Sequence, residues 1–150
     1  MPFVMSSPIT VRYAETDRMG VVYHANYLVW MEVGRTDYLA ELGFPYGRLE
    51  ESGVLFPLCD ASMRLFHPSG YEDRLTVRTR LLKLQSRKVV FGYEIMRDGI
   101  LTVSGSTEHI CTDSRMKVRK LPPELYEVLS RAIDGTSEDV PAAKQDGAGA

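Results

Sequence analysis

Three side chains that can do chemistry stand close together near the start of the sequence: the carboxylate of Asp17, the imidazole of His24 and the amide of Asn26. They come just before a long segment with a helical pattern. A helix N-terminus carries unpaired backbone N–H groups and a partial positive charge, so it can stabilise an oxyanion. A carboxylate on the loop that leads to this helix end could act on the same reacting carbon. Residues 17–26 therefore form a candidate site for attack on a carbonyl group.

The helix that must position these groups is predicted from about His24 to Leu42, where Gly43 supplies a left-handed cap. Its first half is apolar on nearly every side, and charged residues appear mainly in its second half. A helix with this composition is expected to be buried in a core. Other elements of the chain must therefore cover it.

Five segments have the apolar alternation or composition of β-strands. They are residues 7–15, 54–66 with a bend near Asp60, 74–84, 88–97 and 100–112. Asp98-Gly99 predicts a tight hairpin between the last two strands, and short connections favour antiparallel neighbours. We therefore expect an α+β protein in which a curved antiparallel sheet of about five strands is wrapped around one long central helix.

The remaining segments complete a single domain. Residues 48–51 predict a short helical turn, and residues 124–132 predict a small terminal helix with one apolar side. Beyond Asp134 the composition changes to Gly, Ala, Ser, Asp and Pro without periodicity. We expect a domain over residues 1–134 and a disordered tail over residues 135–150.

Composition excludes several classes of partner. The formal charge of the 150-residue chain is −2 at pH 7, which argues against a nucleic acid or an anionic membrane surface. The sequence has no run long enough to span a membrane and no secretory leader pattern. Cys59 and Cys111 are too few for a disulfide framework, so we expect both to be buried, reduced thiols. These features predict a cytoplasmic protein.

One motif of the sequence reads Tyr13-x-x-Thr16-Asp17-x-x-Gly20-Val21-Val22-Tyr23-His24-x-Asn26-Tyr27. It is similar to the signature of the 4-hydroxybenzoyl-CoA thioesterase family, and the order of the predicted elements resembles the hotdog fold. The resemblance also includes Tyr71-x-Asp73, Ser86-Arg87-Lys88 and Leu121-Pro122. It covers residues 7–130, and the motif is specific because many fixed positions match.

This resemblance implies an enzyme that hydrolyses an acyl-CoA to a free acid and CoA, without a cofactor, as a dimer-based homotetramer. It implies that Asp17 is catalytic and that the backbone N–H of His24 polarises the thioester carbonyl. The His24-x-Asn26-Tyr27 version looks most like the subgroup often encoded beside the Tol–Pal envelope system. Aryl-CoA members more often have tyrosine at the position of His24, so the acyl group, short-chain or aromatic, stays open.

Sequence leaves the detailed roles of these residues open. Asp17 could attack the carbonyl carbon or deprotonate a water molecule, and the alternative is an ordinary turn or capping residue. The Asn26 amide could bond Asp17 or cap the loop, and the Thr16 hydroxyl could hold the Asp17 loop. The candidate substrate-binding residues of this region are Thr16, Gly20, Tyr23, Asn26 and Tyr27.

Arg87 and Lys88 lie at a predicted strand boundary. They could bind the phosphates of CoA, although a charged turn that faces solvent has the same composition. Dimerisation through edge strands would hide unpaired strand edges and help to cover the apolar helix.

Several other functions are set aside or kept as rivals. The chain has neither a Gly-x-Ser-x-Gly elbow nor a glycine-rich nucleotide loop. His67 and His109 are isolated, so we expect no metal site. The rivals that remain are a non-catalytic module that binds acyl-CoA or acyl carrier protein, and a hotdog dehydratase or hydratase. Acyl carrier protein is also a possible partner of a thioesterase.

Overall fold

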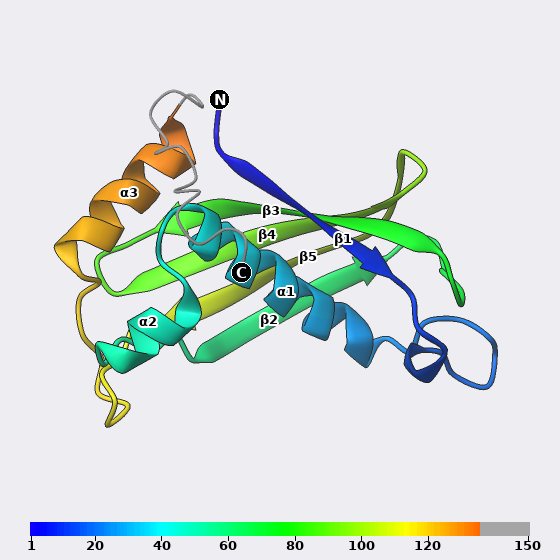
Figure 1. Cartoon of the computed structure of the whole chain (residues 1–150), viewed down its shortest axis with the longest axis horizontal. Coiled ribbons are helices and arrows are strands. Elements are labelled where there is room, and N and C mark those ends of the chain that lie inside the picture. Colours follow the sequence, from blue (N-terminus) through cyan, green and yellow to red (C-terminus); the bar gives the residue numbers. More distant parts are fainter. Residues whose placement is uncertain (136–150) are drawn as a thin grey trace.

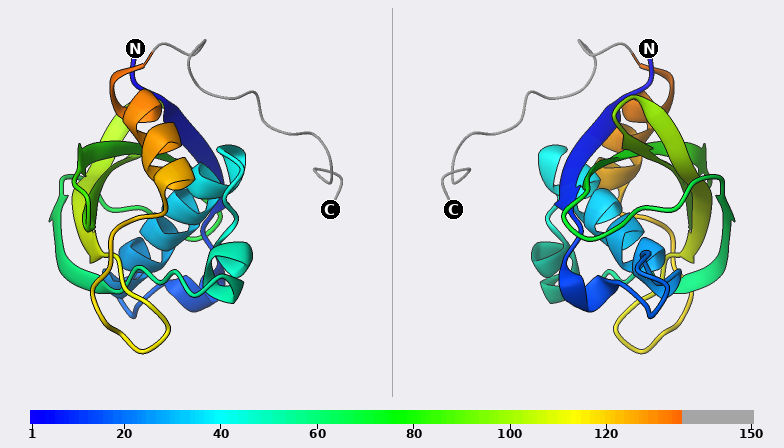
Figure 2. Two further views of the ribbon diagram at one scale, coloured as in Figure 1. Left: turned by 90° about the vertical axis from the view of Figure 1, so that its left-hand side faces the viewer. Right: turned by 90° about the vertical axis from the view of Figure 1, so that its right-hand side faces the viewer.

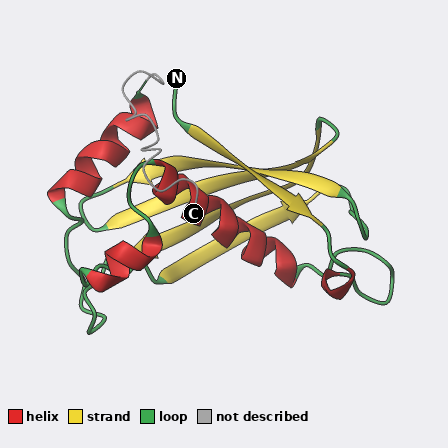
Figure 3. Cartoon of the chain, in the orientation of Figure 1, coloured by secondary structure: helices red, strands yellow, loops and turns green. Residues whose placement is uncertain are grey.

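A computed structural model describes residues 1–135 as a five-stranded antiparallel sheet with helices on one side (Figures 1 and 3). The strands are β1 (Val4–Thr10), β2 (Leu58–Leu65), β3 (Arg74–Leu84), β4 (Lys88–Arg97) and β5 (Ile100–Ile110). The helices are α1 (Ala25–Glu41), α2 (Tyr46–Glu51) and α3 (Pro123–Asp134), preceded by a 3₁₀ turn, η1 (Tyr13–Glu15). The strand order is β1-β3-β4-β5-β2. The tail predicted over residues 135–150 lies, from residue 136 onward, outside the described part.

Alternation along β3 and β4 determines the inner face of the sheet, as predicted. The inward side chains, all buried, are Leu75, Val77, Thr79 and Leu81 of β3 and Val89, Phe91, Tyr93 and Ile95 of β4. The hairpin between β4 and β5 is confirmed. Asp98 and Gly99 both have positive φ, at 50° and 78°, which is the geometry of a type I′ turn.

Helix α1 crosses the inner face, and the sheet curves around it (Figure 2). Two glycines permit the close approach. A Cβ on Gly34 of α1 would collide with the Thr79 hydroxyl of β3, and a Cβ on Gly105 of β5 would collide with the end of Met31. The predicted cap at the other end of the helix is confirmed, because Gly43 has φ 93° and its N–H donates to the Ala40 carbonyl.

Three predicted strands have different boundaries in the structure. β1 begins at Val4 and ends at Thr10, and residues 13–15 form η1 because the Glu15 carboxylate accepts the Arg12 N–H at 2.8 Å and turns the chain. β2 begins only at Leu58, with the expected irregularity at Asp60. β5 ends at Ile110, and Thr112 forms only isolated bridges.

The expectation of a single long central helix is not confirmed, because α3, with 12 residues, is a second substantial helix beside the 17-residue α1. Nor is α1 covered on every side within this chain. Val29 is 52% exposed and Val33 36%. The side of α1 that faces away from the sheet is therefore partly apolar and uncovered in one chain.

Strand β2 forms one edge of the sheet, and nearly all of its residues are exposed. Leu58 and Leu65 at its two ends are each 50% exposed. Cys59 lies on this edge and is exposed, so the prediction of a buried thiol was wrong there, whereas Cys111 is buried. Within residues 1–135 no helix has the length and apolar character needed to cross a membrane.

Candidate active site

The loop that carries Asp17 is a tight turn closed by its own backbone. The Asp17 N–H donates to the Val21 carbonyl at 2.8 Å, and the Gly20 N–H donates to the Asp17 carbonyl at 2.9 Å. The Asp17 carboxylate accepts the Met19 N–H at 2.8 Å. Gly20 has φ 82°, where a side chain would be strained. The half-buried carboxylate is thus held by a fixed turn.

The chain then enters α1 with two backbone N–H groups, those of His24 and Ala25, for which the described residues offer no acceptor. The Tyr23 N–H donates to the Glu15 carbonyl at 2.8 Å, Asn26 N–H to Tyr23 at 2.9 Å, and Tyr27 N–H to His24 at 3.2 Å. Among residues 1–135 nothing accepts the N–H of His24, the N-cap residue of α1. This leaves a free donor at the positive end of a 17-residue helix.

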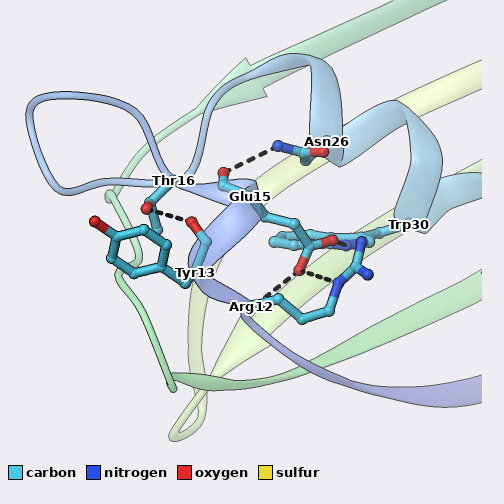
Figure 4. Close-up of polar contacts among 6 residues, drawn as sticks. All are labelled: Arg12, Tyr13, Glu15, Thr16, Asn26 and Trp30. Atoms are coloured by element: carbon cyan, nitrogen blue, oxygen red, sulfur yellow. Dashed lines mark hydrogen bonds and ion pairs between the residues drawn. The ribbon is translucent and has the colours of Figure 1, made fainter.

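Polar side chains next to the loop form hydrogen bonds to its backbone (Figure 4). The Asn26 amide donates to the Glu15 carbonyl oxygen at 2.9 Å, so of its two predicted roles it holds the loop and does not bond Asp17. The Thr16 hydroxyl donates to the Tyr13 carbonyl at 2.7 Å. Both side chains therefore stabilise the backbone around Asp17.

A second anchor comes from the turn before β3. The Val22 N–H donates to the Ser69 carbonyl at 2.8 Å, and Val21 forms a bridge with Gly70. Asp73 accepts the Gly70 N–H at 2.8 Å, and Arg97 bonds the Ser69 hydroxyl at 3.0 Å. Sequence reasoning included Asp73 in the family resemblance but missed Ser69 and Arg97, since neither belongs to a local motif.

The aromatic residues of the motif divide into exposed and buried groups. Tyr23 is 48% exposed, and its ring centre lies 4.4 Å from that of the exposed His24. Tyr27, expected among the substrate-binding residues, is 1% exposed and packs edge-on against Trp30. In this chain Tyr23 and His24 border the candidate site, whereas Tyr27 belongs to the core.

Arg87 and Lys88 are not brought to Asp17 within one chain. They adjoin the β3–β4 turn, at the end of the sheet opposite the Asp17 loop (Figure 1). Lys88 donates to Glu108, with 2.9 Å between Nζ and Oε1, and this bond raises the pKa of Lys88. Arg87 is exposed, and its Nη1 reaches only the Ser86 hydroxyl, at 3.4 Å.

The buried carboxylate of Glu15 escaped sequence reasoning. It is 5% exposed and accepts the Trp30 indole N–H at 2.8 Å. Burial by itself would raise its pKa, but hydrogen bonds from the Arg12 and Trp30 N–H groups, together with the Arg12 guanidinium, hold the pKa of Glu15 below its usual value. Alternation gave no usable signal, because Tyr13 has the same parity as Val11 and Glu15 but is 77% exposed in η1.

Among residues 1–135, the other acidic and histidine residues form neither a second catalytic site nor a metal site. Glu94 lies 3.6 Å from Arg78 as a surface pair, and no group of three His, Cys, Asp or Glu residues in the described chain is arranged to hold a metal ion. The loop and the helix start, in contrast, offer a carboxylate and, seven residues further along the chain, a free N–H. That pair can activate an attacking oxygen and stabilise the resulting oxyanion.

Known proteins with similar sequences include two that are named as acyl-CoA thioesterases. The putative acyl-CoA thioesterase YneP of Bacillus subtilis is 41% identical over 134 residues, which cover 86% of this chain and 97% of that protein. The acyl-CoA thioesterase YbgC of Haemophilus influenzae is 31% identical over 122 residues, 80% of this chain and 90% of that one.

Solved structures and a family model point the same way. The DHNA-CoA thioesterase from Staphylococcus aureus superposes with a TM-score of 0.82 at 37% identity, over 85% of this chain and 89% of that chain. The family model described as the thioesterase-like superfamily matches residues 11–129. The chain therefore belongs to the thioesterase-like superfamily, has its α+β hotdog fold, and is a thioester hydrolase.

Proposed function

We propose that the chain hydrolyses acyl-CoA thioesters, with short-chain or aromatic acyl groups, to a free acid and CoA. Asp17 promotes attack on the thioester carbon, and the backbone N–H of His24 binds the carbonyl oxygen. The observation that carries this proposal is the free His24 N–H at the start of α1, beside the loop that holds Asp17. Relatives named as acyl-CoA thioesterases support the substrate class.

Hydrolysis of a thioester does not require the protein to protonate the leaving group. A thiol with a pKa near 8.5 departs as a thiolate without a general acid. On one route the Asp17 carboxylate attacks the carbonyl carbon, CoA leaves, and water hydrolyses the mixed anhydride. On the other, Asp17 takes a proton from water, which attacks directly. A single turnover in ¹⁸O-labelled water tests for the anhydride route, since label in Asp17 can arise only when water attacks the Asp17 carbonyl of the mixed anhydride.

The preferred acyl group can be identified by testing a panel of thioester substrates. Short-chain, long-chain and aromatic acyl-CoAs, and an acylated acyl carrier protein, are incubated with the wild type and with Asp17→Asn, and free thiol is measured. We expect at least one substrate to be cleaved by the wild type only. Saturable binding without thiol release would indicate a binding module instead, and hydration of an enoyl-CoA would indicate a hydratase.

We also propose that the active unit is a homo-oligomer assembled through the β2 edge. Exposed Leu58 and Leu65, together with unpaired backbone groups, suit antiparallel pairing with a second copy. A two-fold axis there reverses the partner, so its Arg87 and Lys88 lie at the same end of the assembly as this chain's Asp17. The CoA phosphates would then be bound across the dimer, chiefly by Arg87, because Lys88 is already paired with Glu108.

Subunit mixing tests this arrangement. Asp17→Asn and Arg87→Ala are each expected to be impaired alone. In a mixed dimer one site receives both changes, whereas the other keeps a native Asp17 and a native Arg87. Co-refolding the two variants should therefore restore activity above that of either one. A mixture no more active than its components means that the two residues do not act together across subunits.

We further propose a cytoplasmic location. The free thiols of Cys59 and Cys111 suit a reducing compartment. Cell fractionation with an antibody against the chain tests this assignment.

A further inference from the structure

Glu15 connects two parts of the candidate site, the entry to the loop and helix α1, through its side chain (Figure 4). Its Oε1 accepts the Arg12 N–H at 2.8 Å, at the beginning of η1. Its Oε2 accepts the Trp30 indole N–H at 2.8 Å, from the second turn of α1. The side chain is 6% exposed, whereas its Arg12 partner is 75% exposed and lies 3.3 Å away. A carboxylate has thus been buried to join the entry to the loop with the helix.

The main chain of Glu15 joins the same parts again. Its carbonyl oxygen accepts both the Tyr23 N–H at 2.8 Å and the Asn26 amide at 2.9 Å. Asp17 lies two residues after Glu15, and His24 directly follows Tyr23. The separation between the Asp17 carboxylate and the His24 N–H is consequently determined by a frame that meets at Glu15.

We propose that Glu15 is a positioning residue for the thioester hydrolysis proposed above, on which this inference rests. Its carboxylate sets the Asp17 loop against the N-terminus of α1 and touches no substrate. Chemistry at a carbonyl carbon is sensitive to such placement, since an error of about 1 Å between reacting groups can cost about 100-fold in rate.

The charge on Glu15 is part of this function. Both carboxylate oxygens face N–H donors, so an isosteric amide cannot satisfy them together. In Glu15→Gln the amide NH₂ must oppose either the Arg12 N–H or the Trp30 indole, which places two donors against each other. Because Arg12 presents two donors to Oε1, the conflict falls on Trp30.

This conflict provides a rescue experiment. Hydrolysis of the best acyl-CoA from the panel is followed for the wild type, Glu15→Gln, Trp30→Phe and the double variant. We expect Glu15→Gln to lower kcat about 10–100-fold with KM changed less than about threefold. Trp30→Phe removes the opposing donor, so the double variant should recover to the kcat of Trp30→Phe alone, and the two effects should not add.

The protein contains its own reporter and a suitable control. Trp30 is the only tryptophan of the chain, so its fluorescence emission reports the contact with Glu15, and we expect Glu15→Gln to shift it. Tyr93→Phe removes a buried hydrogen bond to Thr107, 2.6 Å long. It should lower the Tm but leave kcat within about twofold, because it acts on stability alone.

The outcomes separate this inference from the proposed function. Activity that requires Asp17, combined with an unchanged kcat in Glu15→Gln and a shifted Trp30 emission, overturns the positioning role alone. Multiplicative losses in the double variant overturn it as well. If Glu15→Gln does not fold, Trp30→Phe decides, because a folded variant with wild-type kcat contradicts the role. A wild type that cleaves no acyl-CoA, or Asp17→Asn with full rate, overturns both proposals.

Discussion

Residues 16–22 and residues 112–118 form the same turn at two places in the molecule. In both, a Thr–Val bridge closes the loop, as Thr16 with Val22 and Thr112 with Val118. In both, the aspartate carboxylate accepts the N–H two residues ahead at 2.8 Å. In both, the aspartate N–H donates four residues ahead at 2.8 Å. Only the first loop, however, leads directly into a long helix.

The difference lies in what surrounds each aspartate. Asp113 accepts a second backbone N–H, from Lys117 at 3.0 Å, and the bonds from Lys117 and Arg115 lower its pKa. The residue seven positions after Asp113 is Lys120, which is not in a helix, whereas the residue seven after Asp17 is His24, with its free N–H. An aspartate turn alone is therefore only a frame, and the proposed chemistry also requires the helix end that follows the first turn.

The largest expected effect separates the two aspartates. Asp17→Asn should lower the rate of thioester hydrolysis about 10²–10⁴-fold, because the amide can neither attack nor accept a proton. Asp113→Asn makes the same change in a matched turn and should leave the rate within about twofold. Thiol release under saturating substrate measures both. Equal losses in the two variants would mean that the turn itself, and not its position, matters.

The next effect concerns the buried histidine that precedes the second loop. His109 is 1% exposed. Burial and the nearby Arg35 lower the pKa of His109 to about 4, although its hydrogen bond to the Phe56 carbonyl acts in the opposite direction and raises the pKa. Because the pKa of His109 is lower in the folded than in the unfolded protein, the full free energy of unfolding is present above the unfolded pKa, near 6.5. It decreases as the pH falls from there toward 4, since the unfolded chain then binds a proton that folded His109 does not. The loss should be on the order of 3 kcal/mol.

Urea unfolding at several pH values measures this loss. His109→Asn keeps a donor for the Phe56 carbonyl but does not titrate, so its stability should be nearly flat between about pH 6.5 and 4. Glu15, beneath the first loop, has a lowered pKa and loses its contribution only as the pH falls below the usual carboxyl range. If the free energy of unfolding of His109→Asn falls with pH as steeply as that of the wild type, His109 is not the cause of the pH dependence.

The smallest effect compares the left-handed position of each turn. Gly20 has φ 82° and Met116 has φ 64°. Gly20→Ala should cost about 1 kcal/mol from backbone strain alone, because a Cβ there meets nothing within 4 Å. Met116→Gly should gain up to about 1 kcal/mol. Urea midpoints measure both, and only Gly20→Ala should also lower kcat.

Local patterns were sufficient for much of the fold. The alternation of β3 and β4 predicted both strands to the residue, and Gly43 marked the end of α1. The pattern misled at Tyr13, where alternation predicted a strand although the carboxylate of Glu15 bends the chain into η1. Local spacing contains no information about a buried acceptor and its donor 15 residues away on Trp30.

The candidate site was predictable only where its residues are neighbours in sequence. Asp17 and His24 could be found because the loop and helix start are contiguous. The contribution of Ser69 and Arg97 could not, because it depends on pairing between residues 21–22 and 69–70 across the fold. Arg87 and Lys88 are the opposite case. The family resemblance predicted them as substrate-binding residues, but within one chain they lie at the end of the sheet far from Asp17.

The central claim is that the backbone N–H of His24 stabilises the oxyanion. Replacing residue 24 by its α-hydroxy acid analogue turns this one peptide bond into an ester, deletes the N–H and keeps the imidazole. The same replacement at Lys120, seven residues after Asp113, is the matched control. We predict that kcat falls about 10²–10³-fold for the ester at position 24 and stays within about twofold for the ester at position 120. A position-24 ester with the kcat of the control would contradict the account.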